Sequence, residues 1–294
     1  MSPRTRGVLL VACAGLLWST LGLGVRLMEE ATAWQIVFYR GLFQALAVTG
    51  WVLHRHRGRV LDAFRSIGWA GVVAALGLGT AYNGMILALS LTSVATVVFV
   101  LGATPLVTGV LAWWLLRERV RPATGVAMAI ALSGIMVMTF GGSGAGHGLG
   151  ILAAGVAVLG NAVFAVALRY GRAVDMLPAV ALAGLVAALL SAPWVSSLTL
   201  TPRDLALCAY LGGFALAVGL ALFTVGSRSL SAVELPLIAM TESVLAPVWV
   251  WVVLGEKAAA ATLLGGALVL GAVLLQALQG DRTTTRAEPA VAEP

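Results

Sequence analysis

Long apolar runs separated by short polar segments dominate this chain. A helix needs about 20 mostly apolar residues to cross roughly 30 Å of hydrocarbon. The runs are rich in Leu, Ala, Val and Gly and lack the period-2 alternation of barrel strands, so they predict transmembrane α-helices. The ten predicted spans are 7–25, 33–53, 67–88, 92–115, 122–140, 148–168, 176–196, 204–227, 231–254 and 258–278.

The composition supports a chain whose main solvent is lipid. It is 60% hydrophobic and only 10% charged, whereas a soluble domain carries about 25% charged residues. The first run is longer than the roughly 7–15 apolar residues of a signal peptide, so we expect it to be retained as a helix. The polar tail 281–294 is predicted to be disordered and cytoplasmic. The fold class is therefore an all-α integral membrane protein.

The placement of the basic residues predicts the topology. If the N-terminus is cytoplasmic, the ten spans leave nearly all of the 18 Lys and Arg residues on the cytoplasmic side. The exceptions are Arg26, Arg203 and Lys257 in outer segments and Arg40 within a span. This bias is typical of multi-pass proteins of the inner (cytoplasmic) membrane. The net charge of +6 therefore reflects topology, and we expect no nucleic-acid partner.

The two halves of the chain resemble each other. The two halves can be overlaid at an offset of 143 and then, after a long basic loop, at an offset of 138. The matches are Trp18 with Asn161, Arg26 with Arg169, Trp51 with Trp194, Ser93 with Ser231 and Glu118 with Glu256.

The third predicted helix of each half carries a stripe of small residues on one face, which allows close helix packing in lipid. The first stripe is Gly71, Ala75, Gly79 and Asn83, and the second is Ala209, Gly213, Ala217 and Ala221. Each half holds five spans, an odd number, so the second half must enter the membrane inverted. We predict two inverted five-helix repeats, 1–141 and 142–280, an architecture of many secondary transporters.

Signals for catalysis are few. The sequence has no HExxH, no Gly-x-Ser-x-Gly, no P-loop and no His/Cys cluster with metal spacing. Cys13 and Cys208 both lie within predicted spans, so no disulfide framework is indicated. We therefore expect no enzyme, no metal and no cofactor.

Two opposite charges fall inside predicted spans, where ionisable groups are costly and face a cavity or a partner. Glu242 is near the middle of span 231–254, and Arg40 is about a third of the way into span 33–53. They either pair with each other across a cavity or bind the ammonium and carboxylate groups of a zwitterionic ligand. Glu234 is nearer a span end and is expected to reach water.

Other polar and aromatic residues complete a candidate substrate cavity, although lipid contact and helix packing are the alternatives for the aromatic ones. They are Trp18, Tyr82, Asn83, Phe99, Asn161 and Phe164. Pro105, Pro236 and Pro247 lie in the fourth helix of each half. Proline removes a backbone donor and kinks a helix, which predicts a hinge or a kink at these positions.

Several short motifs resemble the drug/metabolite transporter superfamily, specifically its EamA-type ten-helix members. They are Gly-Leu-Leu-Trp-Ser-Thr at 15–20, Ala-Thr-Pro-Leu at 103–106, Arg-Glu at 117–118, Ala-Pro-Val at 246–248 and Gly-Glu at 255–256. The resemblance, closest to YddG-type amino-acid exporters, covers residues 7 to about 278. It implies a gradient-linked carrier with a cavity among helices 1–4 and 6–9, and it places Trp18 and Glu242 there by position.

Two transport functions follow as hypotheses. The first is a secondary exporter of amino acids or similar small metabolites, which works by alternating access in the lipid bilayer with protons as a candidate coupling ion. The second is a multidrug cation/proton antiporter. Small antiporters of that kind use an acid in their first helix, which span 7–25 lacks, although Glu242 could substitute. A membrane enzyme or sensor lacks visible support, and the chain is compatible with a monomer.

Overall fold

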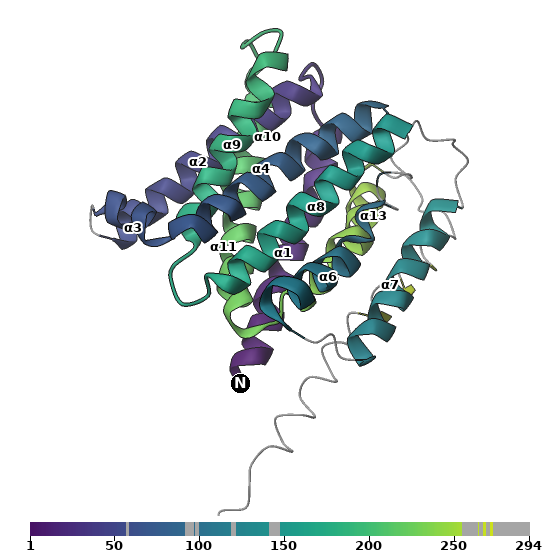
Figure 1. Cartoon of the computed structure of the whole chain (residues 1–294). Coiled ribbons are helices and arrows are strands. Elements are labelled where there is room, and N and C mark those ends of the chain that lie inside the picture. The colour runs from purple at the N-terminus through teal and green to yellow at the C-terminus, as the bar shows by residue number, and fades with distance from the viewer. Residues whose placement is uncertain are drawn as a thin grey trace, which may run out of the picture.

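The computed structural model describes residues 1–56, 59–91, 97, 100–118, 122–140, 148–254, 264, 267–268 and 271–272. Within these ranges the chain is helical with turns and short connections, and no strand occurs. The helices lie side by side in one bundle (Figure 1). The predicted all-α class is confirmed.

The described helices of the first half mostly follow the predicted spans, although the helix within span 92–115 begins only at residue 104 and an additional short helix lies in the basic loop. They are α1 (Pro3–Arg26), α2 (Ala33–Arg55), α3 (Val60–Ser66), α4 (Gly68–Leu91), α6 (Thr104–Leu116) and α7 (Pro122–Phe140).

The second half begins with two helices and continues with two that change character along their length. The first are α8 (Gly148–Tyr170) and α9 (Leu177–Ser191), which ends in the 3-10 turn η1 (Ala192–Trp194). A long helix follows as α10 (Pro202–Ala209), the π-helix η2 (Tyr210–Leu216), α11 (Ala217–Gly226) and the 3-10 turn η3 (Ser227–Ser229). The last described helices are α12 (Glu234–Ala239) and α13 (Thr241–Leu254).

Seven helical segments of the described chain are long and apolar enough to cross a membrane. They are Pro3–Arg26, Ala33–Arg55, Gly68–Leu91, Gly148–Tyr170, Leu177–Trp194, Pro202–Ser229 and Glu234–Val253. Thr104–Leu116 is a shorter apolar helix. The run 258–278 lies largely outside the described residues, so the number of ten spans stays a prediction.

Local capping explains where several helices begin. The Ser2 hydroxyl accepts a hydrogen bond from the Thr5 N–H (3.1 Å), with Pro3 in the first turn of α1. Thr32 and Gln35 form a reciprocal capping box at the start of α2. Such caps satisfy backbone donors that would otherwise have no partner at the first turn.

Ion pairs show which helix termini share one end of the bundle. Arg4, at the start of α1, pairs with Glu234, at the start of α12 (2.7 Å). Arg169, at the end of α8, pairs with Glu118, which follows α6 (2.7 Å). The Ala232 N–H donates to the second oxygen of Glu118 (3.4 Å) and joins the two pairs. Thus α1 begins at the end of the bundle where α8 finishes. Glu234 is only 8% exposed, so the expectation that it reaches water is wrong.

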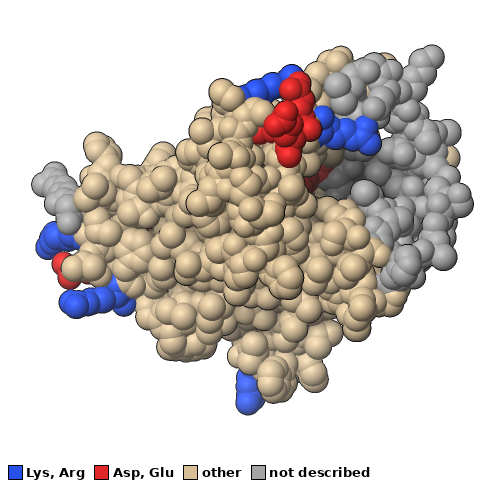
Figure 2. Space-filling model, turned by 90° about the horizontal axis from the view of Figure 1, so that it is seen from above, with Lys and Arg blue, Asp and Glu red and all other residues tan. Residues whose placement is uncertain are grey.

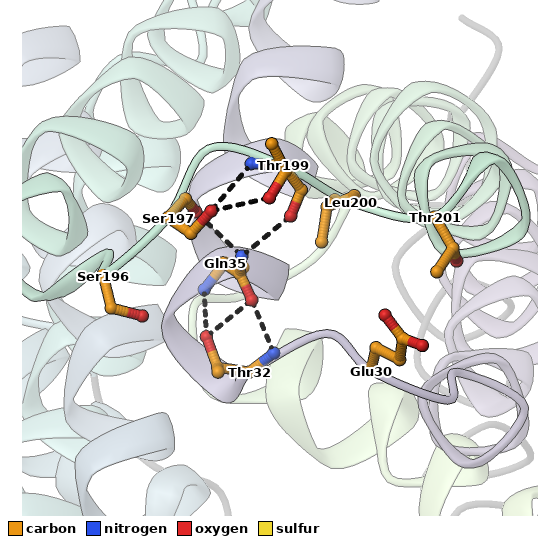
Figure 3. Close-up of a pocket in the computed structure, with 8 residues that line it drawn as sticks. All are labelled: Glu30, Thr32, Gln35, Ser196, Ser197, Thr199, Leu200 and Thr201. Carbon is orange, nitrogen blue, oxygen red and sulfur yellow. Dashed lines mark hydrogen bonds between the residues drawn. The ribbon is translucent and has the colours of Figure 1, made fainter.

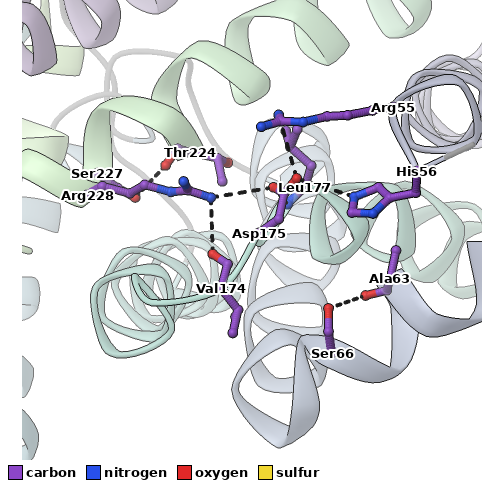
Figure 4. Close-up of polar contacts among 10 residues, drawn as sticks. All are labelled: Arg55, His56, Ala63, Ser66, Val174, Asp175, Leu177, Thr224, Ser227 and Arg228. Atoms are coloured by element: carbon purple, nitrogen blue, oxygen red, sulfur yellow. Dashed lines mark hydrogen bonds and ion pairs between the residues drawn. The ribbon is translucent and has the colours of Figure 1, made fainter.

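Asp175, in the connection between α8 and α9, marks the same end, called here the Asp175 end. Its carboxylate lies 3.6 Å from Arg55 and from His56 at the end of α2, and 3.7 Å from Arg228 in η3 (Figure 4). It also accepts a hydrogen bond from the Leu177 N–H at the start of α9 (3.2 Å). One carboxylate therefore ties α2, α9 and η3 together.

The opposite end, called the Asp204 end, is organised by another carboxylate. Asp204 in the first turn of α10 is fully buried and accepts hydrogen bonds from the N–H groups of Glu29 (3.1 Å), Glu30 (3.0 Å) and Ala31 (3.0 Å). Arg203 forms an ion pair with Glu29 beside it. Viewed from above, the described surface is largely uncharged, with acidic and basic side chains gathered at one place and further charged side chains at the edges of the view (Figure 2).

The packing of the two halves is reciprocal. Helix α1 packs on α11 and α13, while its sequence counterpart α8 packs on α4 and α6. Similarly, α2 packs on α10 and η2, and its counterpart α9 packs on α4. Because α2 and α9 are counterparts of each other, exchanging the halves leaves the contact between them unchanged. Each of these contacts therefore recurs with the halves exchanged, as expected for a duplicated bundle.

Candidate functional site

Arg40 lies inside the bundle and has no anionic partner in direct contact among the residues that the structure describes. It is 9% exposed and belongs to α2. Its guanidinium carbon lies 5.0 Å from the centre of the Tyr82 ring, which α4 supplies. Gly212, in the π-helix η2, packs directly on the Arg40 carbonyl, and a side chain there would collide with it. π-Helices are uncommon in proteins, and those that occur are often at functional sites. Here the π-helix brings a glycine against the backbone of Arg40.

Glu242 lies in the first turn of α13 and is partly exposed. Arg40 interacts electrostatically with Glu242 and with Tyr82. No ion pair within 4.0 Å joins Arg40 to a carboxylate among the described residues. Arg40 and Glu242 therefore do not form a direct ion pair in this conformation. Arg40, Tyr82 and Glu242 are called the charged cluster below.

The helix that carries Glu242 is interrupted just before it. The chain turns at Met240, whose N–H is shared between the carbonyls of Pro236 (3.2 Å) and Leu237 (3.3 Å). Gly15 of α1 packs against this break, and a methyl group there would lie 3.3 Å from the Ala239 carbonyl oxygen. The N-terminus of α13 thus lies beside the Glu242 carboxylate, and its dipole favours negative charge there.

A second interruption occurs at the equivalent place in the first half. The chain turns at Gly102 and Ala103 before α6 begins at Thr104. The offset of 138 carries Gly102 onto Met240. Interrupted helices in corresponding positions of two halves are a feature of transporter binding sites.

The three prolines lie at different places relative to these breaks. Pro105 is in the first turn of α6, and Pro236 is in the short helix α12. Pro247 falls within α13, which continues through it. The chain is thus interrupted near Pro105 and near Pro236, while α13 continues through Pro247. The hinge or kink predicted at each of the three prolines stays a prediction.

Aromatic rings line the bundle next to the charged cluster. Trp18 of α1 lies 5.4 Å from Phe223 of α11, and Phe223 stacks on Phe164 of α8 at 5.9 Å. Trp18 is partly exposed and packs over Gly219. Phe164 is only 3% exposed, so in this conformation it packs in the core and does not line an open cavity. Phe99 lies outside the described residues.

The two asparagines hold helix backbone. The Asn83 amide donates to the carbonyls of Gly79 in its own helix (3.0 Å) and Ala187 in α9 (3.1 Å). Asn161 donates to Ala157 in its own helix (3.0 Å). Asn83 therefore joins α4 to α9, and its carbonyl oxygen remains without a partner.

Several buried polar atoms in the described helices have no hydrogen-bond partner. They are Trp18 Nε1, Gln44 Oε1, Tyr82 Oη, Asn83 Oδ1 and Thr224 Oγ1. Leaving such groups unpaired costs free energy, so native proteins rarely do so without a functional reason. They come from α1, α2, α4 and α11, and two of these helices, α2 and α4, also carry Arg40 and Tyr82. Gln44 and Thr224 were not predicted, although a polar residue inside an apolar run was the available signal.

A separate pocket of about 400 Å³ opens at the Asp204 end and is lined mostly by hydroxyl groups (Figure 3). Gln35 donates to the carbonyls of Ser197 (2.8 Å) and Thr199 (3.2 Å), and its oxygen accepts from Thr32. All polar atoms of Gln35 are thus engaged in holding α2 to the connection between α9 and α10. In the described ranges no group of three or more His, Cys, Asp or Glu residues is arranged to hold a metal ion.

Comparison with known proteins agrees with this architecture. The model of the EamA-like transporter family matches residues 5–140, nearly the whole of the first predicted repeat. A solved structure described only as "Crystal structure of protein" superposes with a TM-score of 0.82 at 23% sequence identity, covering 95% of this chain and 99% of that one. No curated protein matches the sequence. Residues 5–140 are thus similar to a family of membrane transporters, and seven described helical segments are long and apolar enough to cross a membrane, as in a multi-pass membrane protein.

Proposed function

We propose that this chain, similar to EamA-like transporters over its first half, is a secondary-active transporter that exports amino acids or similar small zwitterionic metabolites across the cytoplasmic membrane. It works by alternating access through two inverted repeats, and the Asp175 end faces the cytoplasm. This orientation is supported by the cationic side chains Arg4, Arg55, Arg169 and Arg228 at that end.

The charged cluster carries the proposal. Arg40 and Glu242 are opposite charges within one bundle, and in the described part of the chain no ion pair within 4.0 Å joins them. An unpaired charge is expensive at this depth, so the arrangement is best explained by a ligand that supplies both missing partners. A zwitterion does so: its carboxylate takes the guanidinium and its ammonium takes the carboxylate. Trp18 and Tyr82 then face the remainder of the ligand.

Opposite helix directions in the two halves support alternating access. Helix α1 runs away from the Asp175 end, whereas its counterpart α8 runs toward it, as the ion pairs of Arg4 and Arg169 indicate. Two such halves can exchange conformations, so that a site between them opens to each side in turn.

The multidrug cation/proton antiporter remains the alternative, with Glu242 as the proton-exchanging acid. Arg40 disfavours this function, because a second positive charge would repel a cationic drug near Glu242. Growth of cells on toxic cations separates the two: Glu242→Gln should leave resistance unchanged for an amino-acid exporter and abolish it for the antiporter.

Transport by the purified protein tests the proposal. We expect proteoliposomes preloaded with unlabelled amino acids to take up the same labelled amino acids by saturable counterflow, which needs no coupling gradient. Because both charges of the ligand are bound, amine-only and carboxylate-only analogues should compete at least about tenfold more weakly, a difference of 1.4 kcal/mol. Flux equal to that of protein-free liposomes for every amino acid would contradict the proposal.

Asp175→Asn should weaken closure of the Asp175 end, because it removes the carboxylate shared by Arg55, His56 and Arg228. Ser227 is buried next to Arg228, so a cysteine introduced there by Ser227→Cys becomes accessible to a thiol reagent only when this end opens. The two native cysteines are removed by Cys13→Ser and Cys208→Ala. We expect thiol labelling of the introduced cysteine to accelerate about tenfold, the effect of 1.4 kcal/mol on an opening equilibrium.

The matched control is Asp62→Asn, a change of the same kind at an exposed residue of α3. It should leave the labelling rate unchanged. Equal acceleration by both variants would mean that general loss of negative charge, and not the Asp175 contacts, controls access.

A further inference from the structure

The helices divide into two groups that do not coincide with the two halves of the sequence. The first group is α1, α2 and the helices from α10 to α13, in which α1 packs on α11 and α13, and α2 packs on α10 and η2. The second group is α4, α6, α8 and α9, in which α4 packs on α8 and α9, and α6 packs on α8. Exchanging the sequence halves converts one group into the other.

The contact between α2 and α9 is the extensive one that joins the groups. It is a crossing of backbones. A methyl group on Gly41 would lie 2.6 Å from the Gly184 carbonyl oxygen and 3.2 Å from the Ala188 nitrogen. A methyl group on Gly184 would lie 2.5 Å from the Gly41 oxygen and 3.0 Å from the Ala45 nitrogen.

These contacts are reciprocal in structure and in sequence. Gly41 meets Gly184 and Ala188, while Gly184 meets Gly41 and Ala45. The offset of 143 carries Gly41 onto Gly184 and Ala45 onto Ala188. Each residue therefore contacts the counterpart of its own partner, which is the signature of a twofold axis. The axis of the duplicated bundle passes through this crossing.

A crossing on this axis has the properties of a pivot. Points on a rotation axis move least when two groups turn against each other. Gly and Ala have no long side chains to interlock, so the crossing angle can change without moving side chains between packed arrangements. At the Asp175 end, by contrast, the groups are joined by ion pairs from Asp175 to Arg55 and Arg228, which can break as they separate.

We propose that the α2–α9 crossing at Gly41 and Gly184 is the pivot about which the two helix groups rock during transport. Arg40 directly precedes Gly41, so the charged cluster lies next to the pivot and remains assembled while either end opens. This inference rests on the proposed alternating access and assigns the axis of the motion.

Distances between paired spin labels test the pivot in a background of Cys13→Ser and Cys208→Ala. Leu46→Cys and Leu189→Cys flank the crossing, are related by the offset of 143, and are 68% and 71% exposed. His54→Cys with Arg172→Cys spans the groups at the Asp175 end, and Glu30→Cys with Ser90→Cys spans them at the Asp204 end. Each pair is measured in the full-length protein in nanodiscs, with Asp175→Asn to favour opening of the Asp175 end and Asp62→Asn as the control.

With Asp175→Asn we expect the His54/Arg172 distance to increase and the Glu30/Ser90 distance to decrease by about 5 Å, one helix turn. The Leu46/Leu189 distance should change by less than about 2 Å, the size of a small helix shift. A change at the crossing as large as at the ends, widening of both ends together, or no change at any pair would overturn the pivot. These distances are measured independently of flux. If the distances change as expected but no amino acid is transported, the proposed substrate is rejected and the pivot is kept. If amino acids are transported but the distances do not change as expected, the pivot alone is rejected.

Discussion

Arg40→Gln is expected to reduce amino-acid counterflow by about 100-fold or more while leaving the melting temperature of the protein unchanged or higher. Removing one partner of a buried, hydrogen-bonded charge pair costs about 2–5 kcal/mol, and each 1.4 kcal/mol is tenfold in affinity. The ligand-free protein behaves differently, because no described carboxylate pairs directly with Arg40 there and a buried unpaired charge is destabilising. Flux and melting temperature measured on the same preparation separate these effects.

Two matched variants strengthen this experiment. Arg203→Gln removes an arginine whose side chain is 54% exposed and pairs with Glu29 at the surface, so flux should change little. Arg40→Lys keeps the charge but loses the planar guanidinium that matches a carboxylate, so it should restore only part of the flux. A large fall in melting temperature for Arg40→Gln, with flux falling only in proportion to the folded fraction, would assign Arg40 a structural role.

Gly41→Ala is expected to lower counterflow about tenfold and to destabilise the protein by about 1–3 kcal/mol, the usual cost of overpacking a close contact. The added methyl group would lie 2.6 Å from the Gly184 carbonyl oxygen, a distance that forces α2 and α9 apart. The methyl group is held rigidly by the α2 backbone and the oxygen belongs to the α9 backbone, so no side chain can rotate away to make room. Flux per folded molecule and thermal unfolding in the presence of detergent or lipid check this prediction.

Gly50→Ala is the matched control in the same helix, because no atom lies within 4 Å of a methyl group placed there. Flux should be unchanged, and stability should be equal or slightly higher, since Ala favours a helix over Gly by about 1 kcal/mol. Gly184→Ala should reproduce Gly41→Ala. The double variant should cost less than the sum of the two, because one separation of the helices accommodates both methyl groups. Unchanged flux and stability for Gly41→Ala would contradict the close crossing.

The sequence by itself determined the helical class and most helix positions. An apolar run of about 20 residues has only a helix or a closed barrel available in lipid, because every backbone polar group must be satisfied inside the protein. The predicted spans 7–25, 33–53 and 148–168 therefore coincide with α1, α2 and α8 to within a few residues. Arg40 and Glu242 stood out for the same reason, since charge is costly in an apolar run.

Only the tertiary structure decided how these residues meet. Spacing along α2 and α13 does not fix the distance between Arg40 and Glu242, and the absence of a direct ion pair depends on how the helices pack. Glu234 looked solvated in sequence, but the N-terminal Arg4, 230 positions away, pairs with it and buries it. Phe164 became a packing residue because Phe223 of a distant helix stacks on it.

The crossing of Gly41 and Gly184 shows the same division. The offset of 143 already related the two glycines, yet a glycine within an apolar run is compatible with many contacts. Their role depends on an approach of two backbones that only the folded bundle brings about. Helix formation and burial in lipid can thus be predicted from the sequence, because they depend on each segment and its solvent. Contacts between distant helices depend on the shapes of both partners.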